Sequence, residues 1–333
     1  MPAVSVLMPV RNEARHLPAA LTSLFRQSFR NWELVAVDDG STDATPVLLD
    51  LAARSDARVR VLARPGEGLV PALNAGLAAC RSPLVARMDG DDICHPERLA
   101  CQLRLLGKMP GVDLVACSIR HFPRVSLRGG MAAYERWQNA LLHHDDICRD
   151  LFVESPFAHP SVLFRREKVL DLGGYREMGW AEDYDLWLRL ARHGARFARL
   201  PQTLLFWRDR PERLTRTAAH CSLEAFRACK AHHLRRGFLR GVGEVTLWGA
   251  GIEGKAWRRA LLAEGVKVAR WVEVDRRKIG QRIHGAPVVP IAELGPDQGP
   301  TLITVGARGA RRQIRDWARR RGLTEEEDFL CVT

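Results

Sequence analysis

The first part of the chain alternates apolar runs with segments in which apolar residues recur at helical spacing. The run VSVLMPV at 4–10 has the near-continuous apolar character of a strand covered on both faces. Leu17, Leu21 and Leu24 then recur at the spacing of a helix within 13–29. Further strands are expected at 32–39, 58–64 and 84–89, and further helices at 46–53, 69–80 and 96–106. This alternation predicts an α/β protein with a mostly parallel sheet.

The pattern becomes mixed after Asp113. Strand-like runs at 113–119 and 159–164 flank a charged helical stretch at 131–152. A helix in WAEDYDLWLRL, strands near 196–200 and 203–207, and a basic helical stretch at 209–240 follow. A second strand–helix pattern then begins at EVTLWGAGIEGKAW and continues through VARWVEVD, APVVP and TLITVGARG. We therefore place a domain boundary near Gly241, between domains 1–240 and 241–333.

Charge and composition narrow the class of protein. The 333-residue chain has a formal net charge of +12, which fits nucleic acid, an anionic membrane surface or a phosphorylated small molecule. Its arginines are dispersed and no zinc-finger or RNA-binding motif is visible, so we expect no nucleic-acid partner. No apolar run has the length of a membrane span, and residues 1–13 lack the layout of a secretory signal. The default expectation is a cytoplasmic protein, with peripheral association to the inner face of a membrane left open.

Two acidic turns follow strands of the predicted sheet. Asp38 and Asp39 end the second strand, and RMDGDD at 87–92 follows the fourth. Because the carboxyl ends of parallel strands meet at one edge of a sheet, the two turns are expected to lie close together. Carboxylate oxygens favour Mg²⁺ or Mn²⁺, which complete their ligand shell with water and phosphate oxygens. None of the eight cysteines forms a Cys-x-x-Cys pair, which argues against zinc. The pattern indicates a site for a metal-bound diphosphate.

Each acidic segment also has a simpler interpretation. Asp92 and Asp43 could cap the helices that follow them. Glu182 and Asp183 could provide favourable charge at the N-terminus of their helix. The functional alternative for this pair is a general base that removes a hydroxyl proton as the nucleophile forms its bond.

Five segments, taken in order, resemble inverting glycosyltransferases of family 2, which have the GT-A fold. They are VSVLMPVRNE, VAVDDGSTD, ALNAGL, RMDGDD and WAEDYDLWLRL, and the resemblance covers residues 3–216. It implies a hexosyltransferase that moves a sugar from a UDP- or GDP-sugar to a hydroxyl of a glycan or lipid-linked acceptor, with Mg²⁺ or Mn²⁺ as cofactor. It predicts neither a particular sugar nor an oligomeric state.

The resemblance also implies roles for single residues. The nucleotide-sugar pocket would be lined by Pro9, Asn12, Glu13, Asp39, Asn74 and Asp89, with Arg208 or Arg213 over the diphosphate. Asp91 would be the direct metal ligand, and Asp89 would approach the metal or the ribose. Asp183 would be the base, with Glu182 beside it.

Two further residues have a second possible role, and one position differs from the family pattern. The resemblance places His159 and Trp207 on the acceptor side, whereas each is also compatible with a place in the core. Leu73 stands where many family members have arginine, so one phosphate contact of the family is expected either to be missing or to come from elsewhere.

The C-terminal segment carries a second nucleotide-binding pattern. Gly249, Gly251 and Gly254 follow Gly-x-Gly-x-x-Gly order, and Asp275 comes about twenty residues later. The glycines allow close phosphate approach and the acid can bind a ribose. The alternative is a tight strand–helix turn without a ligand. The segment resembles small Rossmann-like domains of sugar-modifying enzymes. An alternative function for the chain is therefore that of an oxidoreductase that uses the Gly249–Gly254 loop. A third hypothesis is that the chain is a catalytically silent binding module.

Overall fold

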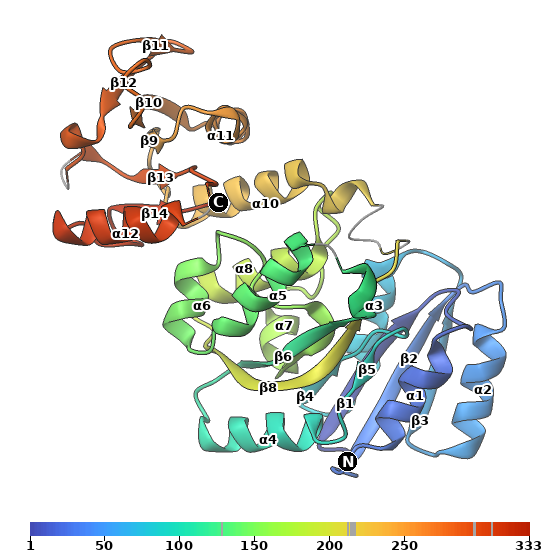
Figure 1. Cartoon of the computed structure of the whole chain (residues 1–333). Helices are drawn as coiled ribbons and strands as arrows, with labels where there is room; N and C mark the ends of the chain where they lie inside the picture. The colour runs from blue at the N-terminus through green and yellow to red at the C-terminus, as the bar shows by residue number, and fades with distance from the viewer. Residues whose placement is uncertain (128, 212, 214–217, 296–297, 308) are drawn as a thin grey trace. The chain divides into compact units, whose positions relative to one another are not determined.

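The chain is divided into two compact α/β units. The computed structural model describes residues 1–333 apart from residues 128, 212, 214–217, 296–297 and 308 (Figure 1). The first unit comprises 1–147, 156–178 and 182–217, and the second comprises 148–155, 179–181 and 218–333. Each unit has its own sheet.

An eight-stranded mixed sheet forms the first unit, in the order β3-β2-β1-β4-β7-β6-β8-β5. Its strands are β1 (Val4–Val10), β2 (Trp32–Asp39), β3 (Val59–Arg64), β4 (Leu84–Arg87), β5 (Ile93–Cys94), β6 (Leu114–Phe122), β7 (Val162–Arg165) and β8 (Phe197–Arg208). Strand β1 pairs in parallel with β2 and β4, so the carboxyl ends of these three strands lie at one edge. Strand β7 runs antiparallel to both β4 and β6. The sheet matches the α/β class that the apolar pattern predicts.

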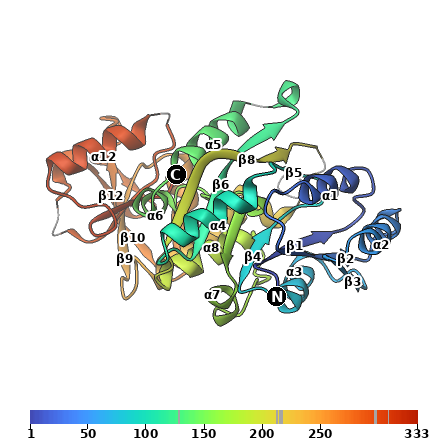
Figure 2. The same ribbon diagram turned by 90° about the horizontal axis from the view of Figure 1, so that it is seen from below.

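Helices cover both faces of this sheet because successive side chains of a strand point to opposite sides. Val4, Val6 and Met8 of β1 share a core with helices α1 (Leu17–Phe25), α2 (Thr45–Ser55) and α4 (Arg98–Lys108). On the other face, α3 (Leu69–Ala79) packs so closely that a Cβ at Gly76 would lie 2.2 Å from Leu7 Cδ1. The remaining helices are α5 (Gly129–Ala140), α6 (His144–Asp150), α7 (Arg166–Asp171) and α8 (Glu182–Arg192) (Figure 2).

The second unit has a six-stranded sheet in the order β11-β12-β10-β9-β13-β14. Its strands are β9 (Glu244–Trp248), β10 (Lys267–Glu273), β11 (Arg282–Ile283), β12 (Ala286–Pro290), β13 (Thr301–Ile303) and β14 (Phe329–Cys331), and its helices include α10 (Leu223–Arg236), α11 (Ile252–Ala263) and α12 (Ala310–Arg320). All neighbouring strands are parallel except β11 and β12. Ala231 and Leu234 of α10 belong to its core, so this unit begins before Gly241, where we placed the boundary.

Several elements differ from the expected ones. The two strands expected near 196–200 and 203–207 are one strand, β8, and its register with β6 shifts beside Pro201, where the apolar pattern is interrupted. The stretch 131–152 contains two helices, α5 and α6. Residues 212 and 214–217 of the expected basic helix lie outside the described residues.

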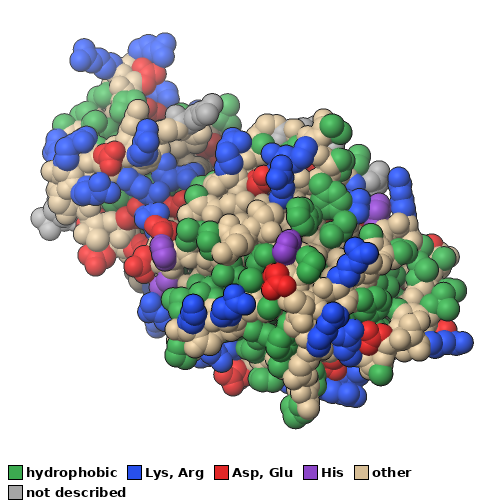
Figure 3. Space-filling view, turned by 60° about the horizontal axis from the view of Figure 1, so that its bottom comes forward, with side chains coloured by type: hydrophobic (Ala, Val, Ile, Leu, Met, Phe, Trp, Pro, Cys, Tyr) green, Lys and Arg blue, Asp and Glu red, His purple; other side chains and the backbone are tan. Residues whose placement is uncertain are grey.

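Two surface properties agree with the expectations from composition. In the part of the chain that the structure describes, no helix combines the length and apolarity that a bilayer crossing requires. Lys and Arg side chains are spread among apolar, acidic and other residues on the face shown in Figure 3.

Candidate active site

Three aspartates converge in the turn that follows β4. Carboxylate oxygens of Asp89, Asp91 and Asp92 lie within 4.8 Å of one another. Strand β4 ends beside β1, which places this turn at the carboxyl edge of the sheet. Gly90 is required there, because a Cβ at this position would lie 2.6 Å from Val10 Cγ1. The close packing of the turn on β1 therefore fixes where the carboxylates point.

Two arginines compensate part of this negative charge. Arg87 Nη2 lies 2.6 Å from Asp89 Oδ1. Arg210 Nε lies 3.1 Å from Asp91 Oδ2, and the Arg210 guanidinium also donates a hydrogen bond to Glu13. Neither arginine was among our predicted site residues. Two features of the sequence could have indicated them. Arg87 opens the acidic segment RMDGDD, and Arg210 is one of the closely spaced arginines in WRDRPER.

The arginines do not fully compensate the negative charge of Asp91, Asp92 and Glu13. Burial raises the pKa of Asp91 and raises that of Asp92 well above its usual range, and the neighbouring aspartates add to both shifts. Burial likewise raises the pKa of Glu13 to about 7. Asp89 differs: burial acts to raise its pKa, but the charge and hydrogen bond of Arg87, with the charges of His159 and Arg213, together lower it. Added positive charge would therefore stabilise the ionised cluster.

The donor set fits a hard divalent cation. All three groups offer carboxylate oxygens, which suit Mg²⁺ or Mn²⁺. Asp92 Oδ2 is buried and, among the described residues, has no hydrogen-bond partner. Asp92 Oδ1 accepts from the backbone N–H of Arg208 at 2.7 Å, so this carboxylate faces β8 and is not a cap of α4. Asp43 precedes Ala44, the N-cap residue of α2, and its carboxylate accepts from Thr45 N at 2.9 Å and from Ala14 N at 3.0 Å, so it joins the start of α2 to the loop after β1.

The loops after β1 and β2 are tied together beside this cluster. Asn12 has a positive φ of 54° and its Oδ1 accepts from Thr42 N at 2.8 Å. Glu13 N donates to Thr45 Oγ1 at 2.8 Å. The Asp39 carboxylate accepts from the N–H groups of residues 67 and 68, each at 2.9 Å. Pro9 is buried within β1. Pro9, Asn12, Glu13 and Asp39 thus lie at or just after the carboxyl ends of β1 and β2.

Asn74, His159 and Glu182 are linked through Tyr175, which the sequence reasoning missed. The Asn74 side chain exchanges two 2.9 Å hydrogen bonds with the backbone of Tyr175. Tyr175 Oη lies 3.0 Å from His159 Nε2, and His159 Nδ1 lies 3.5 Å from Glu182 Oε1. Gly174 permits this approach, because its φ is +71° and a Cβ would lie 2.5 Å from Asn74 Oδ1. The polar groups of Asn74 and His159 are therefore engaged with the protein itself.

The two carboxylates at the start of α8 have opposite pKa shifts. Burial and, next, the charge of Glu182 raise the pKa of Asp183 to about 8. Burial acts to raise the pKa of Glu182 as well, but His159, a backbone hydrogen bond and the charge of Arg87 together lower it. Asp183 Oδ1 accepts from Tyr184 N at 2.6 Å. Adjacent acids with separated pKa values are an arrangement that catalytic acid–base pairs use.

The segment after β8 contributes arginine side chains to this region. Arg208 Nε donates to the Asp91 carbonyl oxygen at 2.7 Å. The Arg213 guanidinium lies 3.9 Å from the centre of the Trp207 ring. Trp207 is itself 9% exposed and belongs to the hydrophobic core of the first unit. The indole thus has a packing role in addition to its contact with Arg213. Leu73 is a buried residue of α3.

Backbone conformation and packing account for two glycines of the motif in the second unit, since Gly249 has a positive φ of 113° and Gly254 lies against the turn. A Cβ at Gly254 would lie 1.8 Å from Gly249 O, so α11 needs glycine to approach the turn. The amide of residue 250 donates to Glu273 Oε1 at 2.9 Å, a contact that the sequence reasoning missed. Asp275, a possible ribose ligand in the sequence analysis, accepts a hydrogen bond from Arg277 Nε at 3.0 Å. Nothing in this loop favours the oxidoreductase alternative.

Comparisons with known proteins identify the family of the chain. The profile described as Glycosyl transferase family 2 matches residues 5–173. Amylovoran biosynthesis glycosyltransferase AmsE from Erwinia amylovora is 35% identical over 206 residues, which are 60% of this chain and 74% of AmsE. Putative glycosyltransferase EpsE from Bacillus subtilis is 29% identical over 69% of this chain and 82% of EpsE.

Solved glycosyltransferases share the fold. TarS 1–349 of S. aureus, in complex with UDP-GlcNAc, superposes with a TM-score of 0.55 at 19% identity, over 80% of this chain and 71% of that one. The mannosyltransferase PcManGT from Pyrobaculum calidifontis, in complex with GDP-Man and Mn²⁺, has a TM-score of 0.50 at 22% identity, over 79% and 69%. The first unit has the GT-A fold, and the chain is a glycosyltransferase that belongs to glycosyl transferase family 2.

Proposed function

We propose that the chain is a metal-dependent, inverting hexosyltransferase that uses a UDP- or GDP-sugar and a hydroxyl acceptor on a glycan or lipid-linked intermediate. One observation carries the proposal: the under-compensated cluster Asp89–Asp92 and the raised pKa of Asp183 occur in one unit, and Asp89 is among the charges that raise the pKa of Asp183. The names of AmsE, TarS and PcManGT support a nucleotide-sugar donor and a role in polysaccharide synthesis.

The acidic turn and its neighbours would hold the donor. Asp89 and Asp91, with Asp92 beside them, would hold Mg²⁺ or Mn²⁺. When bound, the cation supplies positive charge that stabilises the departing diphosphate. Asp39 is held rigidly by backbone N–H groups and keeps acceptor capacity for a nucleobase N–H. Arg208 is fixed beside the acidic turn by its bond to the Asp91 carbonyl.

Asp183 would activate the acceptor. In a single displacement the acceptor hydroxyl attacks the anomeric carbon from the face opposite the diphosphate, and its proton passes to Asp183. Glu182, held by His159, stays ionised and keeps Asp183 basic enough to accept that proton. Because only one displacement occurs, the anomeric configuration inverts.

A donor screen tests the proposal. Thermal shift with a panel of nucleotide sugars, with and without Mn²⁺, should show one donor that raises the melting temperature only when the cation is present. Asp91→Ala should abolish that shift and the transfer of sugar. Asp50→Ala, which removes an exposed carboxylate on α2, should leave both unchanged. Donor binding by Asp91→Ala with Mn²⁺ present, or a product that retains the donor's anomeric configuration by proton NMR, would contradict the proposal.

A further inference from the structure

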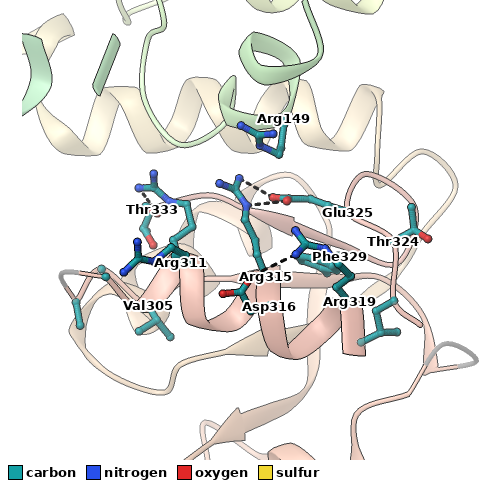
Figure 4. Close-up of a pocket in the computed structure, with 15 residues that line it drawn as sticks. Arg149, Val305, Arg311, Arg315, Asp316, Arg319, Thr324, Glu325, Phe329 and Thr333 are labelled. Carbon is teal, nitrogen blue, oxygen red and sulfur yellow. Dashed lines mark hydrogen bonds and ion pairs between the residues drawn. The ribbon is translucent and has the colours of Figure 1, made fainter. Parts of the chain in front are cut away.

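The second unit contains a cavity of about 790 Å³ that is separate from its glycine motif. The cavity is formed by the loop after β13, one side of α12, the loop that leads to β14, and Arg149 (Figure 4). Four arginines of α12 line it, namely Arg311, Arg312, Arg315 and Arg319. They fall on one side of the helix because their spacing follows its turns. Its volume is in the range of sites for small ligands.

The cavity carries an excess of positive charge. The five lining arginines face two lining carboxylates, Asp316 and Glu325. The buried Asp150 also pairs with Arg149, Arg311 and Arg315. Arginines therefore still outnumber carboxylates, by five to three, around the cavity. The loop that ends at Gly309 brings the N-terminus of α12 to the same cavity, and Gly309 has a positive φ of 80°. The partial positive charge of a helix N-terminus adds to that of the guanidinium groups. An anionic ligand is therefore favoured over a neutral or cationic one.

Two of the arginines are held in place before any ligand binds. Arg315 makes hydrogen bonds of 2.7 and 2.8 Å to Glu325 and one of 2.7 Å to Asp150. Arg311 donates from Nε and Nη2 to the carbonyl oxygen of Thr333 at 3.1 and 3.0 Å. Fixed guanidinium groups recognise phosphate oxygens with little loss of side-chain entropy. Arg312 and Arg319 are exposed at the cavity and are able to approach a ligand from its open side.

The rest of the lining suits a larger molecule than a free phosphate ion. Val305, Leu323 and Phe329 contribute apolar surface to the same cavity. The lining includes Val305, which follows the carboxyl end of β13, and Phe329, which begins β14. We propose that this cavity binds a phosphorylated small molecule of nucleotide size, in which the arginines hold the phosphates and the apolar residues contact the remaining part.

Hydrogen exchange on the full chain tests this site and separates it from the donor site. The probes are UDP, GDP and ADP, with pyrophosphate as the phosphate-only arm, and EDTA is present so that the acidic turn holds no cation. At least one nucleotide should protect amides within 303–325 more strongly than pyrophosphate does. Amides at 37–43 and 87–93 report on the donor site in the same experiment, so failure of one site does not resemble failure of the other.

A charge-reversed variant provides the second measurement. Arg312→Glu with Arg319→Glu should weaken nucleotide binding at this cavity about 100-fold, since a hydrogen bond to a charged group contributes about tenfold or more to affinity. The control is Arg259→Glu with Arg276→Glu, an equal change of charge at exposed positions of the same unit. The proposal is overturned if no nucleotide protects 303–325, if pyrophosphate protects as well as every nucleotide, or if the variant and the control bind alike.

Discussion

Replacing Asp183 by asparagine tests the catalytic assignment most directly. With a pKa of about 8, Asp183 is ionised in about one molecule in ten at pH 7 and in about nine in ten at pH 9, in protein without cation. Only the ionised carboxylate accepts a proton, so turnover should rise with pH through this range. Asparagine keeps the size of the side chain and cannot accept the proton. We expect transfer to fall about 10²–10⁴-fold at the high-pH plateau, which is the usual contribution of a general base.

The assay is the pH dependence of kcat and of kcat/KM for the donor at saturating cation. A cation at the acidic turn favours the ionised form of Asp183, so the wild-type midpoint should lie below 8 and above the ordinary value near 4. The kcat of Asp183→Asn should not depend on pH on the acid side. The ratio of wild-type to variant kcat should therefore become smaller as pH falls. Glu182→Gln should move the midpoint of the remaining activity downward, because it removes a charge that raises the pKa of Asp183.

Three results would refute this reasoning. If Asp183→Asn transfers sugar at nearly the wild-type rate at pH 9, the base lies elsewhere. If it loses donor binding, Asp183 belongs to the donor site. If Glu182→Gln leaves the midpoint in place, the electrostatic account of the pair is wrong. Asp171→Asn, the same chemical change at an exposed position after α7, is the control for effects on folding.

The structure makes further predictions of stability and rate. Gly254→Ala should destabilise the protein by about 1–3 kcal/mol in chemical denaturation, because its Cβ meets the turn at Gly249. Gly251→Ala has open space and should cost less, since it only replaces the N-cap residue of α11 by a less favourable one. His159→Gln should lower kcat while donor KM changes little, because it loosens Glu182 without touching the donor loops. Folded Asp92 keeps its proton to higher pH than the unfolded chain, so the native state loses stability as pH rises above about 4. Asp92→Asn should therefore melt higher than wild type at pH 8 without cation.

The parts of the site that the sequence predicts are those that local pattern encodes. Asp39 and Asp89–Asp92 each follow an apolar run, and parallel pairing brings the ends of such runs to one edge. The Glu182–Asp183 pair opens a helix that is amphipathic in sequence. In each case the chemistry-bearing residue sits at a fixed position relative to a strand or helix terminus, so its placement follows once the element is recognised.

The parts that the sequence does not predict depend on contacts between distant segments. Arg210 reaches Glu13 across a separation of 197 residues, and Asn74 reaches Tyr175 across 101. No spacing rule relates such pairs. The same holds for domain organisation, because residues 148–155 join the second unit although they lie far from it in sequence. Phe152 packs against the core of that unit, which an apolar pattern read along the chain does not reveal.

Arg210 leads to a last prediction, because it lies where a cation would be needed. Its guanidinium contacts both Asp91 and Glu13, so a divalent cation that binds Asp91 must displace part of this contact. Arg210→Ala should bind Mn²⁺ alone about tenfold more tightly by calorimetry, since charged hydrogen bonds contribute about 1.5–3 kcal/mol. The same variant should bind the nucleotide sugar more weakly at saturating Mn²⁺, because the released guanidinium is then able to contact the diphosphate. Arg11→Ala, which removes the 3.7 Å ion pair with Asp39, should leave Mn²⁺ affinity unchanged. Equal or weaker Mn²⁺ binding by Arg210→Ala would show that the guanidinium does not compete with the cation.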